Sequence, residues 1–170
     1  MTDIINDFTE EDYFFMNEAL MEARLARLIE EVPVGCVIVY QGKIIARGHN
    51  FTYKGKSALK HAEMIAINEA SEFMDDFRLE ECTMYVTMEP CSMCAGAIIN
   101  SRIDRLVIAL PDYKRGACGS YTNITGDRGQ LHYIDAEFFL MKDACMYELQ
   151  TFFKMLRKRS KEKKKLKSNN

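Results

Sequence analysis

The chain has 170 residues, of which 48% are apolar and 28% charged, with a formal net charge of −2. These values fit a soluble globular protein large enough to bury a real core. No apolar run approaches the roughly 18 residues of a membrane span, so we expect no membrane protein. The acidic start MTDIINDFTEED lacks the basic residues of a secretory signal or a transit peptide, which favours the cytoplasm.

The first helix is predicted over residues 9–30. The stretch TEED resembles a capping box, with Thr9 as the N-cap and Asp12 three residues later. A helical period then puts the following side chains roughly on one side: Tyr13, Met16, Leu20, Ala23 and Leu28.

The middle of the chain alternates strands with helices. VGCVIVYQGKIIARGHN predicts a hairpin, with strands over 36–40 and 43–47 joined by a Gln-Gly turn. A helix is expected over 61–74, a strand over 82–88, a short helix over 91–100 and a buried strand over 105–110. Strands that alternate with helices indicate a sheet covered by helices on its faces.

A long loop precedes the last elements. Residues 111–130 are rich in Gly, Asp and Asn, and loops of that length in a compact domain are usually functional or mobile. Residues 131–134 predict a final short strand. A helix over 141–159 would carry an apolar stripe of Cys145, Leu149, Phe152, Phe153 and Leu156.

Positive charge gathers at the carboxyl end. Between residues 154 and 167 the chain carries nine Lys or Arg and one acid, so the remainder is acidic. This arrangement is typical of contact with a polyanion, but it also fits a solvated helix end. With neither a repeat nor a linker, we expect one domain over residues 1–159 and a basic tail over 160–170.

Two short motifs hold the candidate chemistry. HAE places His61 and Glu63 at a helix start, and PCSMC places Cys91 and Cys94 at another. Residues three apart share one side of a helix, so both sulfurs can bind one ion. One His and two Cys give three protein ligands, and the fourth zinc position stays open for water, as in catalytic sites. If Glu63 were a fourth ligand the site would be closed, whereas beside the bound water it can act as the general base.

Each motif has an ordinary explanation when it stands alone. A CxxC is often a redox pair or half of a structural zinc site, and an acid in the first helical turn suits the macrodipole. Together, however, they match H-x-E…P-C-x-x-C, the signature of zinc-dependent nucleobase deaminases. The remaining cysteines are scattered, and we expect them to be structural thiols: Cys36, Cys82, Cys118 and Cys145.

Longer segments resemble one family. The stretches EVPVGCVIV, GHN, HAEMIAI, YVTMEPCSMCAGAIINSRI and GACGS are similar to the bacterial tRNA adenosine deaminases, over roughly residues 14–157. The resemblance implies a cytidine-deaminase-like three-layer α/β/α fold with a five-stranded mixed sheet. It also implies a homodimer that hydrolyses the amidine C–N bond of the wobble adenosine in an arginine tRNA anticodon, giving inosine.

The resemblance also implies roles for individual residues. His61, Cys91 and Cys94 match the ligands of one Zn²⁺ per subunit, and Glu63 matches the proton shuttle; no nucleotide cofactor is implied. The positions that match substrate-binding residues are Asn50, Val34, Met88, Asp112, Phe152, Phe153, Lys154 and Arg157. Aromatic residues beside basic ones suit unstacked bases and phosphates, although the two phenylalanines also fit a core.

Three other functions remain open from the sequence. A deaminase of free cytidine, deoxycytidylate or guanine would share the zinc chemistry. A non-catalytic RNA-binding subunit with structural zinc would be expected to lack the acid, yet Glu63 is present. A redox protein would use the CxxC but leave His61 and Glu63 without a role, and its metal content would separate it from the others.

Overall fold

The structure is a computed structural model that describes residues 7–168. The first six residues of the predicted domain and the last two of the predicted tail lie outside the described residues. The described chain forms helices and strands in the order α1 (Glu10–Leu28), β1 (Gly35–Tyr40), β2 (Lys43–His49), α2 (Ala62–Met74), β3 (Thr83–Met88), α3 (Ser92–Asn100), β4 (Arg105–Leu110), β5 (Glu137–Phe138) and α4 (Lys142–Ser168).

The strands form one mixed sheet in the order β2-β1-β3-β4-β5. β1 runs antiparallel to both β2 and β3, whereas β3, β4 and β5 are parallel to one another. Parallel neighbours need a crossover connection, and α3 supplies it between β3 and β4. The predicted three-layer α/β/α fold with a five-stranded mixed sheet is confirmed.

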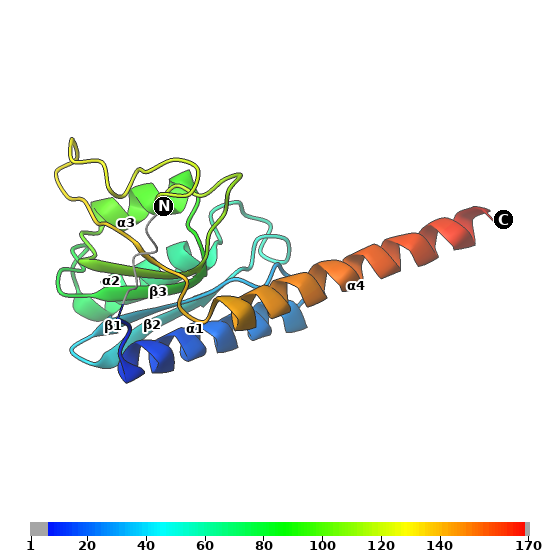
Figure 1. Cartoon of the computed structure of the whole chain (residues 1–170), viewed down its shortest axis with the longest axis horizontal. Helices are drawn as coiled ribbons and strands as arrows, with labels where there is room; N and C mark the ends of the chain where they lie inside the picture. Colours follow the sequence, from blue (N-terminus) through cyan, green and yellow to red (C-terminus); the bar gives the residue numbers. More distant parts are fainter. Residues whose placement is uncertain (1–6, 169–170) are drawn as a thin grey trace.

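The helices cover both faces of this sheet (Figure 1). Side chains alternate along a strand, so Cys36, Ile38 and Met84 lie in a core shared with α2 and α3. Val37 and Tyr85 point the other way, into a core shared with α1 and the start of α4. Burial on both faces explains why the central strands read as continuous apolar runs.

A buried polar network anchors the start of α1 to the sheet. The predicted capping box is present, since Asp12 N–H donates to the Thr9 hydroxyl and the Asp12 carboxylate accepts from Thr9 N–H. The same carboxylate accepts from Tyr85 Oη at 2.6 Å and from the Arg105 guanidinium at 2.5 Å. Asp12 is only 2% exposed, so these donors replace the water that its charge loses on folding.

One strand prediction in the carboxyl-terminal third is wrong. The short strand expected over 131–134 is absent from the described chain, and the fifth strand is β5, which pairs with β4. Leu131 is fully exposed and only Ile134 of that stretch is buried, so its alternation does not mark a strand. β5 is two residues long and half-buried, too short to produce a pattern of its own.

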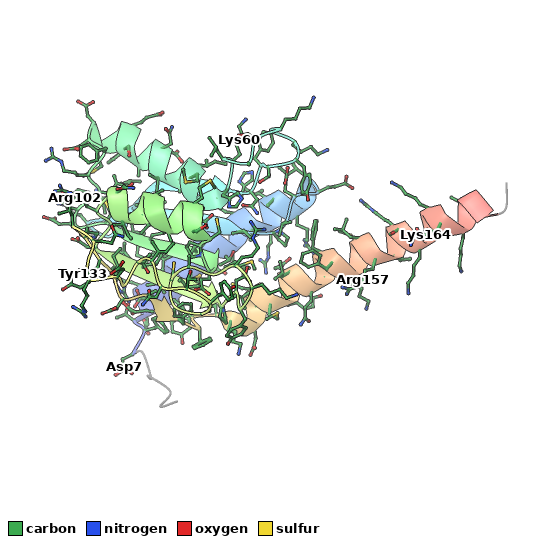
Figure 2. All side chains as sticks on the ribbon, turned by 90° about the horizontal axis from the view of Figure 1, so that it is seen from above. Asp7, Lys60, Arg102, Tyr133, Arg157 and Lys164 are labelled. Carbon is green, nitrogen blue, oxygen red and sulfur yellow. The ribbon has the colours of Figure 1, made fainter. Side chains whose placement is uncertain are left out.

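The last helix is longer than predicted. α4 continues past residue 159 to Ser168, and its final part extends away from the rest of the molecule (Figures 1 and 2). We call residues 160–168 the basic arm. Phe153 and Leu156 of the predicted stripe are about 40% and 39% exposed, because little of the sheet lies beneath this part of the helix. Tyr13 and Leu28 of the side chains expected on one side of α1 are likewise exposed, whereas Met16, Leu20 and Ala23 are buried.

None of the helices in residues 7–168 is both long and apolar enough to span a membrane.

Candidate active site

Two helix starts meet at the candidate site. His61 is the N-cap residue of α2 and Cys91 is the N-cap residue of α3, with Cys94 in the first turn of α3. Neither N-cap side chain accepts a capping hydrogen bond, so both side chains stay available for other partners. The positive end of each helix dipole favours negative charge here, which suits thiolate ligands.

The three side chains form a small triangle. His61 Nδ1 lies 3.8 Å from Cys91 Sγ and 3.5 Å from Cys94 Sγ, and the two sulfurs are 3.8 Å apart. With bonds of about 2.3 Å to sulfur and about 2.0 Å to nitrogen, a tetrahedral zinc ion separates its sulfurs by about 3.8 Å. The same geometry separates a sulfur from the nitrogen by about 3.5 Å. The residues therefore fit a metal ion of that size, and the cluster could hold one.

The cysteine pair already favours a thiolate without metal. Hydrogen bonds from Cys94 and His61 lower the pKa of Cys91 to about 3. The same contact with Cys91, together with burial, raises the pKa of Cys94 well above its usual range. The pair therefore shares one negative charge, and a dication would favour loss of the second proton as well.

Glu63 is buried beside this cluster. It is 3% exposed, in the first turn of α2, and burial is the main cause that raises the pKa of its carboxyl group. Carboxylates in a low-dielectric site hold a proton at higher pH than those in water. Glu63 therefore holds a proton more readily than an exposed carboxylate does, which suits a group that takes up and releases a proton during a reaction.

A cavity of about 320 Å³ opens above these residues. His61, Glu63 and Cys91 lie in its wall, while Cys94 is fully buried behind them. Five of the predicted substrate-binding residues line the same cavity: Val34, Asn50, Met88, Asp112 and Phe153. Val34 precedes β1, Asn50 follows β2 and Met88 ends β3, and the antiparallel pairing of β1 puts all three at one edge of the sheet. Asp112 comes from the loop after β4 and Phe153 from α4, so the fold brings together positions that are far apart in the sequence.

Asn50 performs a structural task that the sequence did not reveal. Its Oδ1 accepts a hydrogen bond from Ala62 N–H at 3.1 Å, which caps α2 in place of the His61 side chain. Asn50 Nδ2 makes no hydrogen bond within residues 7–168, and the residue borders the cavity. One amide can thus hold the helix start with its oxygen and offer its nitrogen to a ligand.

The remaining predicted contacts lie outside the cavity. Phe152 is 2% exposed and its ring meets the edge of Phe153, so it is a core residue and not a ligand contact. The correction follows from helix geometry, since neighbouring positions point about 100° apart and only one of the two can face the cavity. Lys154 and Arg157 are exposed on the next turns of α4, beyond Phe153.

Two further carboxylates in the cavity wall were missed. Glu31 is 1% exposed and accepts from Lys54 N–H at 2.7 Å, while Glu89 is 5% exposed and accepts from loop N–H groups. In the sequence Glu31 begins the stretch EVPVGCVIV and Glu89 stands directly before the PC of the second motif, but neither pattern indicates a role. His49, also without an assigned role, bonds to Glu22 at 2.8 Å and borders a separate hollow.

Comparison with known proteins agrees with this site. The family model for the cytidine and deoxycytidylate deaminase zinc-binding region matches residues 9–110. The tRNA-specific adenosine deaminase of Bacillus subtilis is 39% identical over 155 residues, 91% of this chain and 96% of that protein. The enzyme of the same name from Streptococcus pyogenes is 42% identical over 157 residues, or 92% of each chain. The chain belongs to the tRNA-specific adenosine deaminase family.

Solved structures place the fold in the same family. A structure from studies of A-to-I editing by tRNA:A34 deaminases at the wobble position has a TM-score of 0.77 and 38% identity. It covers 80% of this chain and 99% of that one. A guanine deaminase from Bacillus subtilis is more distant, with a TM-score of 0.56 and 32% identity over 61% of this chain and 66% of that one. For this member of the tRNA-specific adenosine deaminase family, the metal cluster lies within the segment that the family model matches.

Proposed function

We propose that the protein hydrolyses the wobble adenosine of a tRNA anticodon to inosine, with an arginine tRNA as substrate and one zinc ion per chain. The observation that carries the proposal is the His61, Cys91 and Cys94 triangle with buried Glu63 in the wall of one cavity. Relatives named tRNA-specific adenosine deaminase, similar over nine-tenths of the chain, support an adenosine of tRNA as the substrate.

The three ligands leave one coordination position for the reaction. Zinc held by His61, Cys91 and Cys94 would supply a water of lowered pKa to attack C6 of the adenine ring. Glu63 accepts a proton from this water and delivers it to N1 of the ring. The Glu63 carboxylate then takes the second proton of the added water from the oxygen on C6 and passes it to the departing amino group, so that the net reaction consumes one water and releases one ammonia. The burial that raises the pKa of Glu63 suits both transfers.

The cavity wall would orient the base. Asn50 Nδ2 donates to an acceptor on the purine edge while Oδ1 remains bonded to Ala62 N–H. Val34 and Met88 supply apolar contacts in the same wall, which favour an unstacked base over water. Glu63 lies in the first turn of α2 and Asn50 caps the start of that helix. The start of α2 therefore positions both the group that orients the base and the group that transfers the proton.

The anticodon loop would lie along the rim of the cavity. Phe153 lines the cavity and is partly exposed, so a neighbouring base can stack on its ring. Asp112 and Arg115 line it from the loop after β4. Lys154 and Arg157 continue along exposed α4 toward the basic arm, where phosphates of the RNA would be met. These contacts favour a polynucleotide over a free nucleoside.

The proposal extends to the location, the oligomeric state and the domain organisation of the protein. A tRNA substrate is met in the cytoplasm, and the family resemblance favours a homodimer. We assign residues 1–159 to the deaminase domain and the basic arm to RNA attraction that is independent of base sequence.

Inosine formation tests the proposed function directly. Zinc-loaded protein would be incubated with an arginine tRNA anticodon stem-loop, and separately with free adenosine, cytidine, deoxycytidylate and guanine. We expect inosine at the wobble position and little turnover of the free compounds. Deamination of guanine with the RNA unchanged would instead favour the activity of the guanine deaminase relative and overturn the tRNA assignment.

A further inference from the structure

Glu89 connects the turn that carries two metal ligands to the loop of residues 111–120. It follows Met88, the last residue of β3, and precedes Pro90 and Cys91. Its side chain borders the cavity yet is only 5% exposed. A carboxylate that has lost most of its water needs hydrogen-bond donors from the protein to balance its charge.

Backbone groups from both ends of the loop supply those donors. Glu89 Oε2 accepts a hydrogen bond from Asp112 N–H at 2.8 Å. Glu89 Oε1 accepts from Cys118 N–H and from Ser120 N–H, each at 3.0 Å. One side chain therefore holds the beginning and the end of the loop at once. Both carboxylate oxygens are thus engaged by backbone donors of the loop.

The loop closes on this carboxylate at Gly116. A Cβ at that position would overlap the carboxyl carbon and Oε2 of Glu89, so the approach requires glycine. Gly116 also forms a β-bridge with Cys91, and Ala117 N–H donates to the Pro90 carbonyl at 2.9 Å. The loop is consequently attached to the metal-binding turn through both a side chain and the backbone.

This attachment fixes the groups that the loop presents to a ligand. Asp112 and Arg115 line the cavity from the loop, and their positions relative to Cys91 depend on the contacts of Glu89. We propose that Glu89 is a positioning residue that holds the RNA-contacting loop in place against the metal site. The inference rests on the proposed function, because it assigns the loop to RNA; the reaction itself would not pass through Glu89.

Glu89→Gln changes the hydrogen bonding with little change of shape. The amide nitrogen that replaces one oxygen cannot accept, so at least one loop N–H loses its partner. We expect KM for the anticodon stem-loop to rise at least about tenfold, while kcat changes by less than about threefold. Zinc content should stay at one per chain. Native-state hydrogen exchange should speed up at the amides of Asp112, Cys118 and Ser120.

A second pair of variants tests the same attachment from the loop. Gly116→Ala leaves the carboxylate intact but pushes the loop away from it, so it should reproduce the rise in KM and the faster exchange. Gly96→Ala is the matched control, because a Cβ at this α3 position meets nothing within 4 Å. The control should match the wild type in KM, zinc content and exchange.

The outcomes separate this role from its rivals. Loss of kcat with unchanged KM in Glu89→Gln would place the residue in the reaction and overturn the positioning role. Loss of zinc from Glu89→Gln would show that Glu89 supports the metal ligands and not the loop, which also overturns the positioning role. Unchanged KM and unchanged hydrogen exchange in Glu89→Gln would overturn it as well. If the wild type forms no inosine in the stem-loop, the proposed function fails. The exchange and zinc measurements still decide what Glu89 holds in place.

Discussion

Asn50 allows a capping role to be separated from a substrate role by two substitutions. Asn50→Ala removes the acceptor that caps Ala62 N–H as well as the amide donor in the cavity. Loss of a cap costs about 1 kcal/mol, which lowers Tm by about 2–4 °C in a chain of this size. Asn50→Asp keeps an oxygen at the start of α2, where a negative charge contributes about 0.3–1 kcal/mol, but it has no NH₂ group.

The two variants should therefore differ in stability and agree in activity. Thermal unfolding followed by circular dichroism should show a lower Tm for Asn50→Ala and a wild-type or higher Tm for Asn50→Asp. Both should lose at least about tenfold in kcat/KM for inosine formation, since each lacks the donor to the base. Asn68→Ala is the control, because within residues 7–168 the Asn68 side chain bonds only to exposed Glu72 on α2. Full activity in Asn50→Asp would refute the substrate role, and an unchanged Tm in Asn50→Ala would refute the cap.

The remaining predictions concern the reaction, the metal, the arm and acid stability. Glu63→Gln should keep zinc and RNA binding but lose turnover in the inosine assay, and an active variant would remove Glu63 from the mechanism. Cys91→Ala should contain no zinc by elemental analysis; a zinc-replete variant would contradict its assignment as a ligand. The double substitution Lys161→Gln and Lys164→Gln should weaken binding to the stem-loop. It should also reduce the slope of log K against log salt concentration by about 0.7–0.9 per lost phosphate contact, whereas an unchanged slope would exclude the arm from the interface. Burial alone would raise the pKa of Asp12, but hydrogen bonds from its arginine and tyrosine partners hold it well below its usual range. The stability from this lowered pKa is present above the unfolded value of about 3.9 and is lost as pH falls toward the folded value. The urea midpoint of the wild type should therefore fall below pH 4 more steeply than that of Asp12→Asn, and parallel curves would refute this.

Most of the fold could be predicted because its elements have strong local signals. The capping box at Thr9, the Gln-Gly hairpin turn and the apolar runs of β1, β3 and β4 all depend on residues near one another in the chain. β5 could not be predicted in this way, because its two residues are a strand only through their pairing with β4. The exposure of Leu156 likewise depends on where the sheet ends beneath α4, and the helical period of the apolar residues does not show this.

In the candidate site too, residues with a local sequence signal could be predicted and those that depend on packing could not. His61, Glu63, Cys91 and Cys94 could be found because metal and proton chemistry restricts both residue type and spacing. The two phenylalanines of α4 are adjacent and alike, and only the packing of the helix decides which one reaches the cavity. Glu89 could not be assigned because its partners are backbone N–H groups more than twenty residues away, and these leave no mark on side-chain identity.

Under the proposed function, helix formation in the basic arm becomes part of RNA binding. The nine residues of the arm extend for about 13 Å, and the side chains of residues 160–166 are exposed, so burial of apolar surface adds little to the stability of this part of the helix. Lysines at spacings of three and four residues repel one another along it, which opposes the helical state. Phosphates that lie against the arm relieve this repulsion. Binding of a polyanion should therefore increase the helical signal in far-ultraviolet circular dichroism, and the arm folds most completely where its partner is present.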